Sequence, residues 1–344
     1  MTMISFPSIE QFRNVIYNVR QKTFYDDKDS DGNIIVNEIK ELPILTFDGT
    51  VKLRGSNAAI QYNVDNEHLT YQSRNRILSL QSDLSGFMMY METIREKVLT
   101  NIFRSIVCRF PISKIVVYGE WAGQGIQKGV AIAELAKMFV IFGIRVVDNE
   151  ENMRWLDFSD FEFDLDEYRV FSIYNFPTYE VKIDFNYPQL IQNTLIDLTD
   201  MVERECPVGK YFGVSGIGEG IVFKCVTPGY NSSKYWFKSK GAAHSNSKVK
   251  TLNPIDVESV ENVRKFVEYA VTENRLDWAL NNMLVEQLVP FEMKSLGTFI
   301  KTVSNDVFKE ERDVIVKNQI DAKKIGSAIA NVARPWYIKR FNEG

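Results

Sequence analysis

The chain has 344 residues, of which 45% are hydrophobic and 25% are charged, as in ordinary globular proteins, and this length is sufficient for two domains. The net charge of −4 does not by itself indicate a nucleic-acid partner. The chain starts without a basic segment followed by an apolar one, and no stretch approaches the roughly 18 consecutive apolar residues of a membrane span. We therefore expect a cytoplasmic protein with no membrane partner.

The first part of the chain predicts one helix and then mostly strands. Apolar side chains recur at helical spacing over residues 8–22. Strands are predicted where β-branched and aromatic residues cluster, at 42–62 (two strands around Lys52), 115–118, 139–147, 220–226 and 235–238. The aromatic and acidic stretch that begins at Asp148 shows no periodicity that orders its elements.

The last part of the chain predicts helices. Asn253 can cap a helix that has Pro254 at its first position, and apolar residues then recur at helical spacing. Two later apolar stripes predict helices at 276–284 and 325–332, the second ending before Pro335.

This change of pattern places a domain boundary within residues 245–252. We expect an α+β fold, with one domain over residues 1–248 that contains the strands and a small all-α domain over residues 249–344. No internal repeat or low-complexity segment interrupts either part.

One acidic stretch matches a calcium-binding loop. Residues 27–38 follow the Asp-x-Asp-x-Asp-Gly pattern of an EF-hand and end on Glu38 at its twelfth position. The outgoing helix would be cut short by Pro43, and no second hand occurs in the sequence. We therefore favour an acidic surface turn and keep a calcium-binding module as an alternative.

Charge is distributed unevenly along the chain. The stretch 148–167 is rich in acids, and we interpret it as a solvated face. No acid occurs between Glu219 and Asp256, and the lysines in that interval are Lys224, Lys234, Lys238, Lys240, Lys248 and Lys250. We interpret this basic stretch as a phosphate-binding surface.

The scarcity of cysteine and histidine directs attention to lysine as a nucleophile. The 3 cysteines are far apart, which argues against a disulfide framework or a zinc site, and the 2 histidines leave few options for a Cys/His or Ser/His dyad. An amine is nucleophilic only when neutral, so a reactive Lys52 should have a pKa lowered by desolvation and neighbouring cations.

Other residues supply further parts for nucleotidyl transfer to Lys52. Lys238 and Lys240 are two apart on a predicted strand and so point to one face, where both could hold an α-phosphate and disfavour protonation of Lys52. Gly55 fits a tight turn that lets the backbone approach a phosphate.

Three more side chains complete the predicted pocket. Glu120, at the end of a strand, could accept hydrogen bonds from ribose hydroxyls, and Phe142 offers a flat apolar face to an adenine. Glu219 and Lys224 are five apart on one predicted strand and face opposite sides in regular geometry, so either the strand bulges or only one of them enters the pocket. We assign Glu219 to the pocket, as a ligand of Mg²⁺ or of metal-bound water.

At these residues the chain resembles the covalent nucleotidyltransferases, and most closely the ATP-dependent RNA ligases typified by bacteriophage T4 RNA ligase 2 and the kinetoplastid RNA-editing ligases. The most specific segment is 118–128, which is similar to the third motif of that family and its extension. Lys52 matches the adenylated lysine and Asn57 the asparagine of the first motif. The later motifs match Arg74, Glu120, Phe142, Glu219, Lys238 and Lys240.

The resemblance implies a nucleotidyltransferase domain built on antiparallel sheets and a helical C-terminal domain. It implies that ATP adenylates Lys52 with Mg²⁺ or Mn²⁺, and that RNA with 3′-hydroxyl and 5′-phosphate ends, in a nicked duplex, receives the AMP and is sealed. By the same resemblance Arg74 and Glu120 contact the ribose, and Phe142 stacks on the adenine. We expect the protein to act as a monomer.

The chain departs from the family's first motif at Val51 and Arg54, where glutamate and histidine are usual. The sequence therefore supports adenylation of Lys52 more directly than the later steps. A DNA ligase or a GTP-using capping enzyme of the same fold is an alternative, although both usually carry a small β-barrel where this chain predicts helices. A non-enzymatic nucleic-acid-binding module is the alternative of another class.

Overall fold

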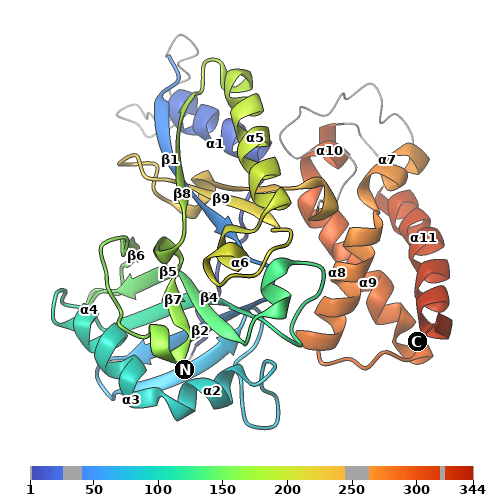
Figure 1. Ribbon diagram of the computed structural model, residues 1–344. Coiled ribbons are helices and arrows are strands. Elements are labelled where there is room, and N and C mark those ends of the chain that lie inside the picture. Colours follow the sequence, from blue (N-terminus) through green and yellow to red (C-terminus); the bar gives the residue numbers. More distant parts are fainter. Residues whose placement is uncertain (1, 26–40, 245–262, 318–321, 344) are drawn as a thin grey trace. The chain divides into compact units, whose positions relative to one another are not determined.

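The computed structural model describes residues 2–25, 41–244, 263–317 and 322–343, which divide into two compact units, Met1–Gly241 and Ala242–Gly344 (Figure 1). The candidate calcium loop at 27–38 and the helix start at Asn253 lie outside the described residues. So does the expected boundary between residues 248 and 249, which stays a prediction.

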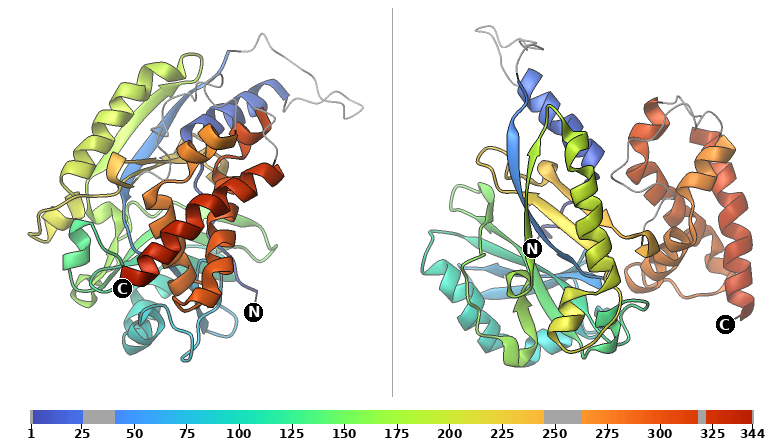
Figure 2. Two further views of the ribbon diagram at one scale, coloured as in Figure 1. Left: turned by 90° about the vertical axis from the view of Figure 1, so that its right-hand side faces the viewer. Right: turned by 45° about the horizontal axis from the view of Figure 1, so that its top comes forward.

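The first sheet of the N-terminal unit is antiparallel, with strands in the order β10-β9-β1-β8. The strands are β1 (Ile44–Lys52), β8 (Thr178–Asp184), β9 (Gly220–Cys225) and β10 (Trp236–Lys240). Helix α1 (Phe12–Tyr25) packs on β10, and α5 (Gln192–Arg204) packs on β9 and β10 (Figure 2). Between them Phe237 contacts the rings of Phe12, Phe47 and Phe223, so this face of the sheet is filled by apolar packing.

The second sheet has the order β3-β2-β4-β5-β6, and β7 pairs with β5 in parallel. Its strands are β2 (Ser56–Asn63), β3 (His68–Ser73), β4 (Lys114–Ala122), β5 (Met138–Val147), β6 (Met153–Leu156) and β7 (Val170–Ser172). One face is covered by α2 (Phe87–Thr93), α3 (Arg95–Val98), the π-helical turn η1 (Leu99–Arg104) and α4 (Ser105–Val107). Phe87 packs there on Trp121 and Phe139, and Phe103 on Tyr62.

The remaining faces of the two sheets are turned toward each other. Trp236 of β10 belongs to one buried cluster with Tyr118, Ala59 and Val116 of the second sheet and with Phe6. Side chains alternate along a strand, and residues paired across strands share a face of the sheet. The contact of Trp236 with the second sheet therefore identifies the residues whose side chains face the space between the sheets. From the first sheet these residues are Asp48, Lys52, Lys224, Lys238 and Lys240, and from the second sheet Asn57 and Glu120.

The C-terminal unit consists of helices where it is described. They are α7 (Val263–Ala270), α8 (Glu273–Val285), α9 (Leu296–Glu310), α10 (Arg312–Lys317) and α11 (Ala322–Glu343). The expected end of the last helix before Pro335 is wrong, because α11 continues through Pro335. Burial of Ala333 and Tyr337, and stacking of Trp336 on Phe299 at 5.5 Å, stabilise the helix on both sides of the proline.

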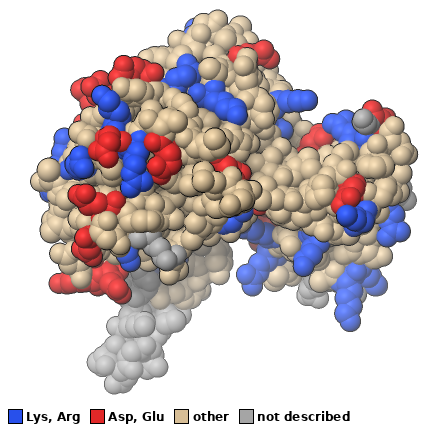
Figure 3. Space-filling model, turned by 90° about the horizontal axis from the view of Figure 1, so that it is seen from below, with Lys and Arg blue, Asp and Glu red and all other residues tan. Residues whose placement is uncertain are grey.

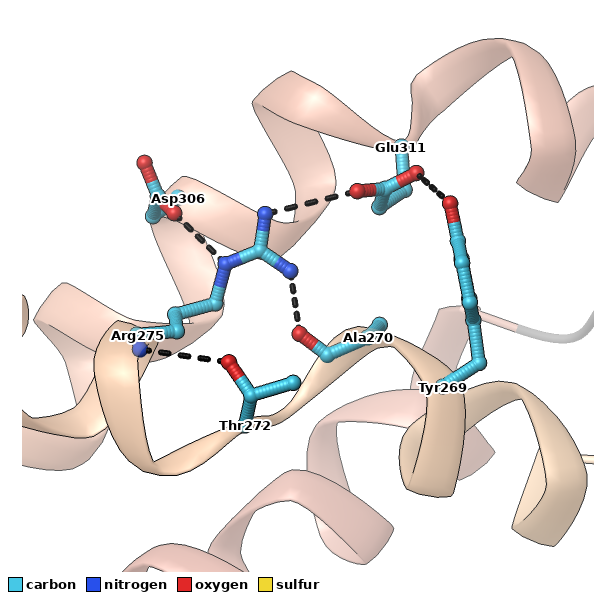
Figure 4. Close-up of polar contacts among 6 residues, drawn as sticks. All are labelled: Tyr269, Ala270, Thr272, Arg275, Asp306 and Glu311. Carbon is cyan, nitrogen blue, oxygen red and sulfur yellow. Dashed lines mark hydrogen bonds and ion pairs between the residues drawn. The ribbon is translucent and has the colours of Figure 1, made fainter. Parts of the chain in front are cut away.

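A buried arginine joins the helices of this unit (Figure 4). Arg275 of α8 is 1% exposed, and its Nε donates to Asp306 at 2.7 Å. Its Nη2 donates to Glu311 at 3.4 Å, and Nη1 donates to the carbonyl of Ala270. Glu311 also accepts a hydrogen bond from Tyr269 at 2.9 Å. The guanidinium therefore connects the α7–α8 turn to α9 and to the residue that follows it.

The α+β class and the antiparallel sheets are confirmed, while several boundaries differ from the expectation. The first helix begins at Phe12 rather than near residue 8, because Glu10 is extended and bridges to Phe237 of β10. The strand β3 and the helices from Phe87 to Val107 were not predicted. No described helix is long and apolar enough to cross a membrane.

Candidate active site

The ends of three neighbouring strands bring Lys52 and Lys240 together. Gly220, the first residue of β9, pairs with Lys52 at the end of β1 on one side and with Lys240 at the end of β10 on the other. A Cβ at Gly220 would lie 2.0 Å from the carbonyl oxygen of Ser239, so only glycine permits this approach. The sheet pairing thus places both lysines beside the residue that precedes Gly220, which is Glu219.

Glu219 binds both lysines at once. Its Oε2 lies 2.6 Å from Lys52 Nζ and its Oε1 lies 3.0 Å from Lys240 Nζ. The Glu219 residue is 6% exposed. Burial alone would raise its pKa, but the charges of Lys52 and Lys240 outweigh burial and hold the pKa well below the usual range. Burial, together with the charges of Lys52 and Lys238, lowers the pKa of Lys240 against the opposing effect of Glu219.

Glu219 does not lie on the strand that carries Lys224. The expectation that both belong to one strand is wrong, because β9 begins at Gly220. Lys224 faces the second sheet, and its Nζ donates to the main-chain carbonyl of Phe142. Both side chains therefore face the space between the sheets, Glu219 from the position before the strand and Lys224 from the strand itself.

Glu120 faces this pair from the second sheet. It lies directly opposite Asn57 in the β2–β4 ladder, and its Oε1 accepts a hydrogen bond from the Gly55 amide at 2.9 Å. A Cβ at Gly55 would come within 2.4 Å of the Trp121 carbonyl oxygen. Glycine is therefore required here for close approach of the chain after Lys52 to β4, and the expected phosphate turn stays a prediction.

The electrostatic surroundings of Glu120 include three other predicted residues. Burial, together with the charge of Glu219, raises the pKa of Glu120 to about 7 against the opposing effects of Lys52, the Gly55 amide and Arg74. Arg74 follows the last residue of β3 and is partly buried. Arg74 therefore lies within electrostatic reach of the carboxylate that it was predicted to accompany.

Helix α5 supports the strand that presents the lysines. Lys238 and Lys240 are partly buried on one face of β10, as the predicted alternation requires, and Ser239 between them is buried on the other face. The hydroxyls of Ser239 and Thr199 lie 2.5 Å apart, and Thr199 also donates to the carbonyl of Leu195 at 2.6 Å. Because Thr199 has one hydroxyl proton, Ser239 is the donor between the two hydroxyls.

Phe142 lies at an irregularity of β5. Tyr118 of β4 pairs with Gly143 and Gly119 pairs with Ile141, so Phe142 is the additional residue of a β-bulge. Its ring is partly buried and meets the ring of Phe6 edge-on, with centroids 4.9 Å apart. Phe6 was not predicted from the sequence, because an isolated phenylalanine in an irregular segment carries no local signal.

The carboxylates suit a metal that arrives with a phosphate ligand. No group of three or more Cys, His, Asp or Glu residues that could hold a metal occurs among the described residues. Mg²⁺ is often bound by one or two carboxylates and by substrate phosphates, with several waters retained. Glu219 fits such a role if its lysine partners turn to the phosphates, so its assignment as a metal ligand stays a prediction.

Comparison with known proteins gives one family. The sequence model described as RNA ligase matches residues 46–240, a range that includes Lys52, Glu120, Glu219 and Lys240. A comparison with curated protein sequences gives no match.

Solved structures of a Naegleria gruberi RNA ligase are similar to this chain. A lysine-to-methionine mutant with AMP and Mn shares 18% identity, with a TM-score of 0.44, over 71% of this chain and 57% of that protein. A lysine-to-alanine mutant with ATP and Mn gives the same identity, coverage and TM-score, namely 18%, 71%, 57% and 0.44. The complex with PPi gives 17% identity and a TM-score of 0.41 over 71% and 57% of the two chains. The match spans little more than half the length of these ligases.

Proposed function

Because the chain belongs to the RNA ligase family, we propose that it is an ATP-dependent RNA ligase that joins 3′-hydroxyl and 5′-phosphate ends of RNA, of the kind typified by T4 RNA ligase 2. The observation that carries this proposal is the convergence of Lys52 and Lys240 on Glu219, opposite Glu120. A nucleophilic amine, a second cation and two carboxylates are thereby gathered between the two sheets.

In the first step the Lys52 amine attacks the α-phosphorus of ATP. A phosphorus–nitrogen bond forms, the bond to the β-phosphate oxygen breaks, and pyrophosphate leaves. Lys238 and Lys240 face the same space and offset the charge on the α-phosphate oxygens. An amine attacks only in its neutral form, so Lys52 must lose its proton before the phosphorus–nitrogen bond forms.

Nucleotide binding requires an exchange of ion-pair partners. Glu219 forms ion pairs with both lysines, at 2.6 Å to Lys52 and 3.0 Å to Lys240. We expect the α-phosphate to take the place of Glu219 at Lys240 and to free Lys52. The freed Glu219 carboxylate would hold a Mg²⁺ or Mn²⁺ ion, which supplies positive charge to the leaving pyrophosphate when bound.

The nucleoside would lie along the second sheet. Glu120 and Arg74 would bind the ribose hydroxyls, and Phe142 would offer its ring to the adenine. Asn57 stands opposite Glu120 in the ladder and would complete the polar side of the pocket. Glu120 accepts a hydrogen bond from the Gly55 amide, which keeps the carboxylate in place before the nucleotide enters.

The later steps need RNA. An oxygen of the RNA 5′-phosphate attacks the adenylate phosphorus and releases Lys52, and the 3′-hydroxyl of the other strand then attacks the activated phosphate and expels AMP. The helix α11 exposes the cations Lys323, Lys324, Lys339, Arg334 and Arg340. In the view of Figure 3 both signs of charge occur on each unit, and blue basic side chains are prominent on the C-terminal unit. Such cations favour a phosphate backbone and make RNA binding weaken as salt rises.

Labelling with radioactive nucleotide tests the first step. The protein is incubated with Mg²⁺ and α-labelled ATP or GTP, and we expect an ATP-derived label that survives alkali and is released by acid or hydroxylamine, as a phosphoramidate is. Lys52→Ala should lose the label. Lys182→Ala, which changes an exposed lysine of the same sheet, should keep it. Failure to label with either nucleotide, or labelling of the Lys52 variant, refutes the proposal.

A second assay determines which kind of nucleic-acid strand receives the AMP. The labelled protein is offered a nicked RNA duplex, the same nick in DNA, and single-stranded RNA. We propose that the nicked RNA duplex is sealed, and that the protein elutes as a monomer on size exclusion. Sealing of the DNA nick, or labelling by GTP, would assign a DNA ligase or a capping-type enzyme instead.

A further inference from the structure

Lys224 links the two sheets at the proposed base-binding residue. Its Nζ, on β9, donates to the main-chain carbonyl of Phe142 on β5. The same ammonium lies 5.0 Å from the ring centroid of Trp236, the residue opposite Lys224 in the β9–β10 ladder. This direct bond crosses from the first sheet to the second.

The carbonyl that Lys224 binds belongs to a residue that has no register partner in the neighbouring strands. In β4 the register steps from Tyr118 to Gly119 across the bulge, so no residue of β4 pairs with Phe142. The pairing of β5 with β6 begins at Ile144, and the pairing with β7 ends at Ile141. Sheet pairing therefore leaves Phe142 without a residue opposite it, and a buried carbonyl that lacks a hydrogen bond is costly. The Lys224 ammonium donates a hydrogen bond to this carbonyl.

Partial burial of this lysine is itself unfavourable, which indicates a specific use. Burial lowers the pKa of Lys224 to about 8, and the nearby Asp48 and Asp157 act in the opposite direction. Asp48 lies opposite Lys224 in the β1–β9 ladder. The Lys224 side chain remains there despite the cost of desolvating its ammonium. It holds the Phe142 carbonyl by a hydrogen bond that an apolar side chain of similar length could not form.

We propose that Lys224 is a positioning residue for recognition of the nucleobase. It fixes the bulged peptide of Phe142 and thereby sets the angle at which the Phe142 ring meets the base, while the edge-on contact of Phe6 supports the ring. This inference rests on the proposed function, because the base belongs to the ATP that adenylates Lys52. Lys224 acts through Phe142 and does not itself touch the reacting phosphate.

The test measures labelling of Lys52 as a function of ATP concentration in Lys224→Met, which keeps the apolar stem and removes the donor. The expected result is a rise of roughly tenfold in the half-saturating ATP concentration, as for the loss of one charge-assisted hydrogen bond. The rate at saturating ATP should change less than twofold. Lys224→Arg, which retains charge and donors, should recover part of the affinity. Lys182→Met is the control for removal of a lysine from the same sheet.

Two further measurements separate positioning from general loss of structure. Inorganic tripolyphosphate has no base, so its inhibition constant against labelling should be the same in wild type and Lys224→Met. In a double-mutant cycle, Lys224→Met should add little to the affinity loss of Phe142→Ala, because both variants act on one contact. The inference is overturned if the affinity losses of Lys224→Met and Phe142→Ala multiply in the double variant. It is also overturned if Lys224→Met weakens tripolyphosphate binding as much as ATP binding, or if Lys224→Met binds ATP with wild-type affinity.

The same variants distinguish failure of this inference from failure of the proposed function. Equilibrium binding of ATP is measured in Lys52→Met, which cannot be adenylated, with and without Lys224→Met. If wild type is never labelled but ATP binding falls tenfold on loss of Lys224, the positioning role stands and the ligase proposal fails. If labelling is normal and ATP binding is unchanged, Lys224 has no such role and the ligase proposal stands.

Discussion

Replacement of Glu120 by glutamine should make the protein more stable at neutral and alkaline pH. Glu120 is a partly buried carboxylate whose pKa is raised from 4.5 to about 7. Between these two values the folded chain keeps a proton that the unfolded chain releases, so the free energy of unfolding falls as pH rises through this window. Above pH 7 the folded chain bears the full cost of the charge. Glutamine carries no charge and can still accept the hydrogen bond from Gly55.

The structure sets the size of this effect. The difference between 4.5 and about 7 corresponds to roughly 3 kcal/mol at about 1.4 kcal/mol per pH unit, as an upper bound. Solvent contact of the partly exposed side chain reduces this figure, and an amide oxygen is a weaker acceptor than a carboxylate. We therefore expect Glu120→Gln to raise the free energy of unfolding by about 1–2 kcal/mol at pH 8 and by much less at pH 5.

The measurement is urea unfolding at pH 5, 6, 7 and 8, monitored by tryptophan fluorescence. Separate transitions are fitted for the two units, since a two-domain chain need not unfold in one step. Glu134→Gln, at an exposed position, is the control and should stay within about 0.5 kcal/mol of wild type. A Glu120→Gln variant that is no more stable than wild type at pH 8, or whose gain does not grow between pH 5 and 7, would refute this reasoning.

Two further predictions concern other parts of the chain. Arg275→Met should destabilise the C-terminal helical unit by about 3–5 kcal/mol, because the buried carboxylates of Asp306 and Glu311 lose their cation. Urea unfolding monitored by circular dichroism at 222 nm measures the loss of helix. An unchanged urea midpoint contradicts the prediction. Thr199→Val should cost about 1–2 kcal/mol, because it leaves the buried Ser239 hydroxyl without its acceptor, whereas Ser239→Ala removes that donor and should cost less. The reverse order in thermal or urea unfolding would show that this hydrogen bond is not the cause.

Local patterns predicted the parts of the fold that depend on neighbours in sequence. The alternation along β10 places Lys238 and Lys240 on one face because the side-chain period of a strand is two. Pro335, by contrast, led us to expect that the last helix ends before it, but α11 continues through this residue. Packing of Trp336 and Tyr337 outweighs the local cost of the proline. The bounds of α1 changed for a similar reason, because Glu10 pairs with β10 before the helix begins.

The sequence by itself predicted which residues carry the chemistry: Lys52, Glu120 and the two lysines of β10 stand in an order that indicates nucleotidyl transfer. Tertiary structure alone decided which of them meet. Lys52 and Glu219 are 167 positions apart, and strand pairing at Gly220 brings them to 2.6 Å. The link from Lys224 to Phe142 likewise depends on a bulge in one sheet and a register in another. Such contacts are set by non-local pairing, and no local pattern of residues encodes them.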